Sequence, residues 1–188
     1  LDNLKAIDWW HDELCKGRKL SAVGGSDYHK DYFVVRILGR PVTYIYSNGR
    51  SQNDLLKAIK EGRTSISSKI GGTFIDINCG DSVVGDTVKV DENTKVEINV
   101  TNLKKGHILN VYDNEGIIYT YKAKKKCDHN VVLPVKSSKF ISADVRYKLK
   151  GLKKFLFDIV MTFYIPKQAF MKDLPLMVEA LCSPIWFE

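Results

Sequence analysis

From residue 73 onward the chain consists of short segments in which apolar and polar residues alternate, and this pattern limits the fold more than any other feature. Examples are TFIDINC, KVEINVTNL and GIIYTYKA, and turn residues such as DNEG at 113–116 separate them. A period of two places the apolar side chains on one face of a strand. Several such segments at intervals of about ten residues predict an all-β immunoglobulin-like sandwich over residues 73–188.

Residues 1–72 follow another pattern, in which helical and extended segments alternate. The stretch DNLKAIDWWHDELCKG repeats apolar residues at helical spacing and stops at Gly17. A second helix is predicted in SQNDLLKAIKEGRT, with Ser51 as its cap and Gly62 at its end. The stretches KLSAVGGSD and PVTYIY beside these helices are predicted to be strands. We therefore expect an α/β layer and a domain boundary at KIGGT, after residue 72.

Charge and cysteine usage exclude several classes of protein. The formal charge of +7 is spread, since residues 1–72 hold 12 basic and 8 acidic side chains and residues 73–188 hold 17 and 14. Neither part is a basic arm, so we expect no nucleic-acid partner. The densest basic run, YKAKKKCDHN, is predicted to be a solvated hairpin end. The four cysteines include no C-x-x-C pair and are predicted to be reduced thiols. This favours a cytoplasmic location, although a secreted or surface-attached parent stays open.

The region after residue 151 is hydrophobic and irregular, and its pattern predicts no definite structure. Its longest apolar stretch, FLFDIVMTFYI, is shorter than the roughly 20 residues that cross a bilayer and contains Asp158. We therefore expect no transmembrane segment. The region holds more aromatic and aliphatic residues than one strand needs, so the surplus is expected to pack on the rest of the chain or on another chain, as in a homo-oligomer. Trp9 and Trp10 are likewise expected to serve packing.

The segment AVGGSDYH holds the strongest candidate for chemistry. Asp27 and His29 project to the same side if the strand continues, and a carboxylate with an imidazole suits zinc, manganese or iron. Gly24 and Gly25 would let the backbone pass close to metal ions. The common alternative is a turn or helix cap at the aspartate. Two ligands are also fewer than the three of a catalytic zinc site, and the other three histidines lie in the predicted helix and sandwich.

The residues around this triplet, NLKAIDWWHDELCKGRKLSAVGGSDYH, resemble the closing ligand segment of PHP (polymerase and histidinol phosphatase) metallohydrolases, in particular the carbaryl-esterase-like CehA/McbA branch. The likeness continues through LGRPVTYIY, LLKAIKEGRTSISS and GDSVVGDTV, and ALCSPIWF is similar to the last strand of the family's appended sandwich. The resemblance implies a distorted (β/α)7 barrel in which two or three metal ions hydrolyse phosphate or other esters through a metal-bound hydroxide. It makes Asp27 and His29 metal ligands.

The family's H-x-H pair, its bridging carboxylate and its further histidines come from earlier strands, and none stands in this sequence. The resemblance therefore implies a C-terminal fragment. Residues 1–72 would be the last strand and helices of the barrel, and residues 73–188 an accessory sandwich with a hydrophobic insertion around 152–179. The missing N-terminal part of the barrel would be its partner, and a small ester or phosphate its substrate. Arg40 would contact an anionic substrate. We expect the fragment alone to be inactive and to bind metal weakly or not at all.

Two other functions stay compatible with the sequence. The sandwich could be a non-catalytic binding or docking module for a protein, a carbohydrate or a cell surface. It could also be a structural cap that shields the barrel. Substrate identity lies beyond the sequence, because a metal-activated hydroxide serves phosphate, carboxyl and carbamate esters alike.

Overall fold

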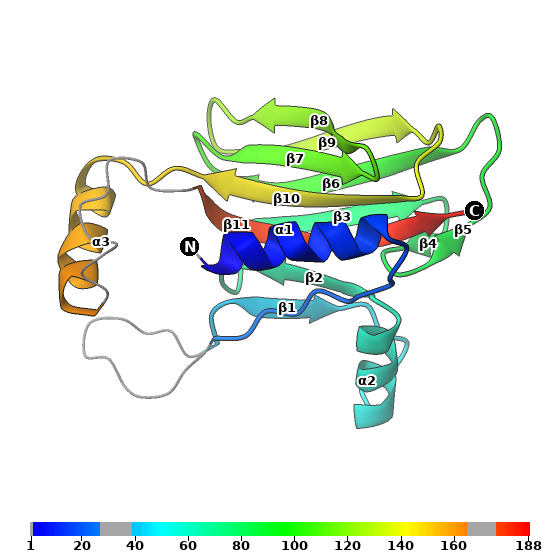
Figure 1. Ribbon diagram of the computed structural model, residues 1–188, viewed down its shortest axis with the longest axis horizontal. Coiled ribbons are helices and arrows are strands. Elements are labelled where there is room, and N and C mark those ends of the chain that lie inside the picture. Colours follow the sequence, from blue (N-terminus) through cyan, green and yellow to red (C-terminus); the bar gives the residue numbers. More distant parts are fainter. Residues whose placement is uncertain (1, 27–38, 165–175) are drawn as a thin grey trace.

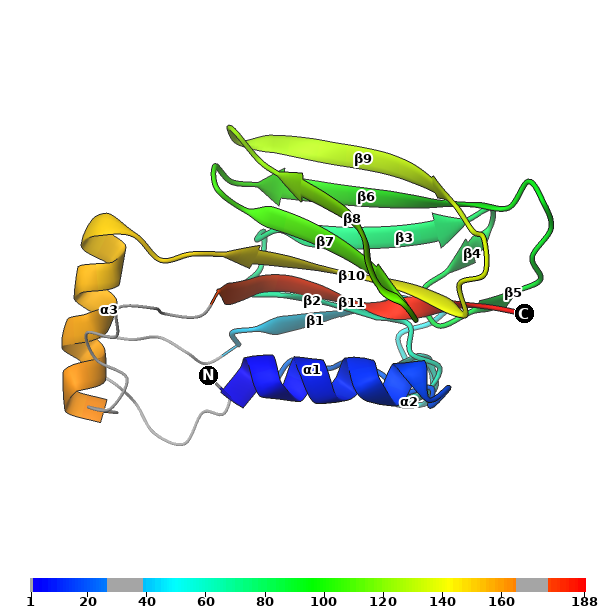
Figure 2. The ribbon, with the colours of Figure 1, turned by 45° about the horizontal axis from the view of Figure 1, so that its top comes forward.

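Two β-sheets packed face to face form the body of the molecule, and a helix lies across the outer face of the larger sheet (Figures 1 and 2). This computed structural model describes residues 2–26, 39–164 and 176–188. The mostly-β, sandwich-like architecture that the alternating segments predict is confirmed. Within the described ranges the helices are α1 (Asp2–Cys15), α2 (Gln52–Lys60) and α3 (Gly151–Tyr164).

The larger sheet combines strands from both ends of the chain. In spatial order it contains β1 (Val42–Ile45), β2 (Thr64–Ser67), β11 (Met177–Phe187), β10 (Phe140–Tyr147), β7 (Ile108–Asp113) and β8 (Gly116–Lys122), and β5 (Thr87–Val88) pairs in parallel with β11. The smaller sheet contains β4 (Ser82–Val83), β3 (Phe74–Cys79), β6 (Lys95–Leu103) and β9 (Cys127–Pro134).

The main core lies between the sheets and follows from the alternation. In β6, Val96, Ile98 and Val100 point inward and are fully buried, while the residues between them face outward. Ile75 and Ile77 of β3 do the same. Full burial of an aliphatic side chain contributes about 1.5–3 kcal/mol each. The period-two pattern therefore supplies both the strands and the surface on which they pack.

Helix α1 builds a second core on the opposite face of the larger sheet. Its inward side carries Ile7, Trp10 and Leu14, which pack in one cluster with side chains of β10 and β11. The Trp10 indole N–H donates to the carbonyl of Leu20 at 2.9 Å. The packing role expected of Trp10 is confirmed. Trp9 is 57% exposed, so that expectation is wrong for Trp9, which lies on the outer side of the helix.

Residues on both sides of the predicted boundary at residue 72 contribute to one sheet. Strand β2 pairs antiparallel with β11, with Ser65 opposite Cys182 and Ser67 opposite Ala180. Strands β1 and β2 also pair antiparallel with each other. In the described parts of residues 1–72 there is thus no parallel β-α unit of the kind that a barrel uses. Pairing across more than 100 residues is not visible in a local pattern, because period-two segments do not specify their neighbours.

The stretch KLSAVGGSD does not form the predicted strand in its described part, residues 19–26. Hydroxyl groups of neighbouring strands satisfy its backbone instead. The Ala22 N–H donates to Ser183 Oγ at 3.1 Å, and Thr64 Oγ1 donates to the Ala22 carbonyl at 2.7 Å. Buried backbone groups need such partners when no sheet ladder supplies them. Side-chain hydroxyls of β2 and β11 therefore anchor this segment to the larger sheet.

The predicted insertion at 152–179 begins as helix α3, which lies at the end of the sandwich where α1 starts (Figure 1). The last three residues of the predicted insertion, 177–179, belong to β11. Within the described residues, no helix is both long enough and apolar enough to cross a membrane.

Candidate functional site

The predicted metal ligands Asp27 and His29 lie outside the described residues. The segment that leads to them is described as far as residue 26. Among the described residues, no group of three or more histidines, cysteines or carboxylates is placed to hold a metal ion.

Gly24 lies just before this segment, and there the backbone is held close to β1 and β2. Its N–H donates to Thr43 Oγ1 at 2.9 Å. A Cβ atom at this position would lie 2.8 Å from Pro41 Cγ and 2.9 Å from Ile66 Cγ2, which is too close for any residue but glycine. At Gly24 the backbone therefore lies close against an apolar wall formed by Pro41 and Ile66. Gly25 has open space around it.

A cavity of about 410 Å³, which we call the glycine cavity, opens beside these glycines. Gly24, Gly25 and Arg40 line it together with side chains of α1 and β11, and Glu179 also borders it. Arg40 is exposed. The fold therefore brings the predicted substrate-binding arginine next to the glycine pair that precedes the predicted ligands, although 15 residues separate Arg40 from Gly25 in the chain.

The other histidines serve packing in the described structure. The His129 ring stacks on Tyr121, with centroids 3.7 Å apart, and its Nε2 lies 2.8 Å from the Tyr119 hydroxyl. The His11 ring meets the edge of Tyr112 at a centroid distance of 4.5 Å. Burial lowers the pKa of both His11 and His129. None of these residues lines the glycine cavity.

A buried polar group on β10, the Asp144 cluster, was not anticipated from the sequence. The Asp144 carboxylate is fully buried and accepts hydrogen bonds from Asn110 Nδ2 at 3.1 Å and the Tyr112 hydroxyl at 3.1 Å. Arg146 forms an ion pair with it, with Nη2 2.6 Å from Oδ2. Burial, followed by the charge of Asp144, raises the pKa of Tyr112. The only local signal was the D-x-R spacing, which places both charges on one face of a strand.

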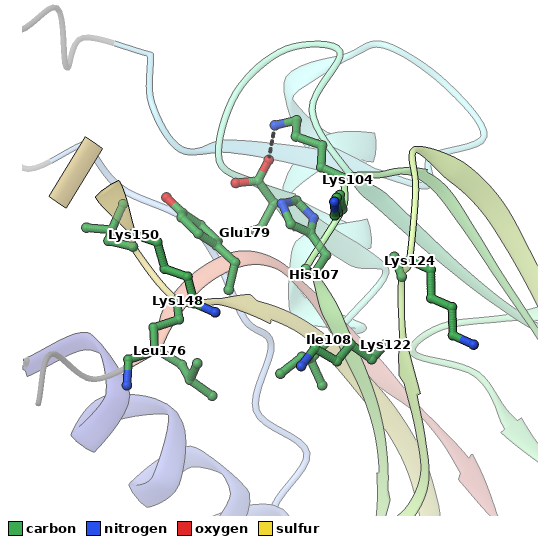
Figure 3. Close-up of a pocket in the computed structure, with 14 residues that line it drawn as sticks. Lys104, His107, Ile108, Lys122, Lys124, Lys148, Lys150, Leu176 and Glu179 are labelled. Carbon is green, nitrogen blue, oxygen red and sulfur yellow. Dashed lines mark hydrogen bonds and ion pairs between the residues drawn. The ribbon is translucent and has the colours of Figure 1, made fainter. Parts of the chain in front are cut away.

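A larger cavity of about 810 Å³, which we call the lysine cavity, lies at the end of the sandwich that carries the β6–β7 connection (Figure 3). Its floor includes His107 and Tyr147, whose rings stack with centroids 5.4 Å apart. Its rim carries six lysines: Lys104, Lys105, Lys122, Lys124, Lys148 and Lys150. The Glu179 carboxylate forms an ion pair with Lys104, with Oε1 3.0 Å from Nζ.

Two of these lysines, Lys122 and Lys124, come from the basic run that was expected to be a hairpin end. That expectation is wrong, because β8 and β9 belong to different sheets and the run carries the chain from one sheet to the other. The predicted solvent exposure is correct for 124–126. The lysines come in three pairs, at 104 and 105, at 122 and 124, and at 148 and 150. A pair of lysines is common in any exposed segment, so the sequence did not indicate that these three segments meet at one cavity.

Comparison of the chain with protein-family models, with curated proteins and with solved structures gave no match.

Proposed function

We propose that this chain is the C-terminal part of a metal-dependent hydrolase of the phosphoesterase type, with the β-sandwich as its accessory domain. The run from NLKAIDWW to GGSDYH, with its resemblance to the final ligand motif of PHP metallohydrolases, supports this. The glycine cavity is the structural observation that carries it. A segment bearing a carboxylate and an imidazole departs from an anchored point, Gly24, and a cationic side chain, Arg40, lines the same cavity.

In the intact parent, Asp27 and His29 would hold one of two or three divalent cations, with zinc, manganese or iron as the metal. When bound, such cations supply hydroxide at neutral pH by lowering the pKa of water to about 7, and they polarise the ester. His29 would donate a neutral ring nitrogen and Asp27 a carboxylate oxygen. Arg40 would neutralise an anionic substrate through its guanidinium fork. The remaining ligands would come from the missing N-terminal part of the barrel.

The test uses the longer gene product that includes the sequence before residue 1. We expect hydrolysis of p-nitrophenyl phosphate or p-nitrophenyl acetate that requires added manganese or zinc. Asp27→Asn and His29→Gln should each lower this activity by about 100-fold or more, because losing a metal ligand exceeds the 10–100-fold cost of losing a group that merely orients one. Asp31→Asn, a carboxylate four residues from Asp27, is the matched control and should retain activity.

Metal analysis of the 188-residue chain complements this test. We expect less than one equivalent of zinc or manganese after gel filtration, because two protein donors are too few. If the longer protein shows no metal-dependent hydrolysis, or if Asp27→Asn leaves it unchanged, the hydrolase proposal is wrong.

A second function, docking onto a partner, is favoured by an apolar stripe on α3. Counted from Leu152, the residues Phe155, Leu156 and Ile159 lie three, four and seven positions further along, which places all four on one helical face. All four are exposed, by 37–72%. On another side of the helix, Lys154 pairs with the buried Asp158 at 2.6 Å. A stripe of this kind is typical of a surface that a partner covers.

We propose the missing part of the barrel as the occupant of this stripe, because α3 lies at the end of the sandwich where α1 begins (Figure 1). Leu156→Glu should then weaken co-purification of residues 1–188 with a separately expressed N-terminal part. Lys57→Glu on α2 is the control, and it should not. If instead sedimentation shows a dimer of residues 1–188 that Leu156→Glu dissociates, the stripe joins two copies and a homo-oligomer replaces the barrel as its occupant.

A further inference from the structure

The lysine cavity concentrates most of the net charge of the protein. Six lysines against one glutamate line it, a net formal charge of +5, while the whole chain carries +7. The single carboxylate, Glu179, is only 5% exposed and is already paired with Lys104. Among the described residues, the other five lysines of the rim form no ion pair. A concave site with one sign of charge focuses its field on an incoming anion.

The backbone around the cavity is held in place before any ligand arrives. The Gly106 N–H donates to the carbonyl of Ala123 at 2.8 Å, and the Ala123 N–H donates to the carbonyl of His107 at 2.9 Å. These two bonds join the β6–β7 connection to the end of β8. Ala123 and His107 are both buried. The lysines on these two segments therefore project from a fixed frame, which limits the entropy lost on binding.

The floor of the cavity is apolar and aromatic, unlike its rim. Tyr147 stacks on His107 with an interplanar angle of 24°, and Ile108, Leu149 and Leu176 are half-buried around the same space. Burial, followed by the charge of Glu179, raises the pKa of Tyr147, so its hydroxyl keeps its proton and can donate to an anion. A ligand that fills this site would present both an anionic group and an apolar body.

We propose that the lysine cavity binds a small organic anion that carries a phosphate or sulfate group, with its charged end among the rim lysines and its apolar part against Tyr147 and Leu149. The volume of about 810 Å³ lies within the range of small-molecule sites, which hold about 300–1,000 Å³. Lysine binds such oxyanions as a point charge. The proposal rests on the residues that line the lysine cavity, and it does not depend on the hydrolase function.

Calorimetric titration of the 188-residue chain tests this proposal, with phenyl phosphate and phenyl sulfate as probes. Inorganic phosphate and phenol isolate the two halves of the ligand. We expect phenyl phosphate or phenyl sulfate to bind more tightly than either half alone, because the rim and the floor act together. Binding should weaken as salt rises, since the rim lysines are exposed. Whichever aryl ester binds more tightly shows whether the site prefers a phosphate or a sulfate group.

The variant Lys122→Glu/Lys148→Glu should weaken phenyl phosphate binding by about tenfold or more, since charge-assisted contacts of this kind each carry about that factor. The matched control is Lys95→Glu/Lys136→Glu, which changes the net charge equally. Lys95 begins β6, about 30 Å along the strand from Lys104 at about 3.3 Å per residue. The control should keep the affinity within about twofold. Unchanged urea midpoints would show that both variants fold.

Three results would overturn the proposal. The first is the absence of saturable binding by either aryl ester at millimolar concentration. The second is an equal loss of affinity in both double variants, which would mean attraction to the overall charge rather than to the cavity. The third is binding of a single-stranded oligonucleotide that exceeds that of phenyl phosphate and falls equally in both variants, which would assign the lysines to a polyanion track.

Discussion

Replacing Asp144 by alanine tests whether the Asp144 cluster holds β10, β7 and α1 together. The carboxylate is fully buried and binds Arg146, Asn110 and the Tyr112 hydroxyl. Its removal leaves a guanidinium and two polar groups without their acceptor. His11 of α1 packs on the Tyr112 ring, so the change also reaches the helix.

Removing one member of a buried ion pair costs about 3–5 kcal/mol. The Arg146 side chain is 17% exposed, so water recovers part of its solvation in the Asp144→Ala variant. We therefore expect a loss of about 3 kcal/mol in the free energy of unfolding, at the lower end of that range. Asp144→Ala/Arg146→Ala should cost less than the sum of the two single changes, because no unpaired ion is left in the core.

Urea unfolding followed by tryptophan fluorescence is a suitable assay, because Trp10 and Trp186 are both buried in the core under α1. Asp81→Ala is the matched control, since Asp81 is exposed in the turn between β3 and β4 and should change the stability by less than about 0.5 kcal/mol. If the unfolding free energy of Asp144→Ala lies within about 1 kcal/mol of that of the unsubstituted chain, the Asp144 cluster does not stabilise the fold and its predicted desolvation cost is wrong.

Further predictions concern the backbone, the pH and the thiols. At Gly85, with φ of +88°, a Cβ would overlap the carbonyl oxygen of Glu61, so Gly85→Ala should lower the unfolding free energy by at least about 2 kcal/mol in the urea assay. Burial lowers the native pKa of His11, so the unfolded state takes up a proton at a higher pH than the native state does. The free energy of unfolding should therefore fall as the pH drops below about 6.5. If His11→Gln leaves the pH dependence of the unfolding free energy unchanged, this reasoning is wrong. Ellman's reagent should reach the exposed Cys15 in the native protein but Cys182, whose thiol pKa burial raises, only after unfolding.

The elements that could be predicted are those with a local cause. Strands β3, β6, β7, β8 and β10 appear where apolar and polar residues alternate, because neighbouring side chains on a strand point to opposite faces. Ser51 caps the start of helix α2, and its hydroxyl accepts from the Asp54 N–H at 3.2 Å, as the capping sequence indicated. Helix α1 was expected two residues longer than its observed end at Cys15.

The failures have a common cause in long-range pairing. The stretch at residues 19–26 looked like a strand because it is apolar, but hydroxyls of Thr43, Thr64 and Ser183 took the place of a sheet neighbour. The run at 121–130 looked like a hairpin end because it lies between two strands, yet those strands joined different sheets. A short segment does not carry information on which of several possible neighbours it will meet.

The candidate sites divide in the same way. The sequence by itself determined the candidate ligand motif with Asp27 and His29, the glycines before it and the turn and cap residues, because each of these depends on the chemistry or conformation of a few adjacent residues. Only the tertiary structure decided that Arg40 lines a cavity with Gly24, that the Asp144 carboxylate is buried, and that lysines from three separate segments surround one cavity. Those outcomes depend on contacts between residues far apart in the chain, which form because the two sheets bury their apolar faces together.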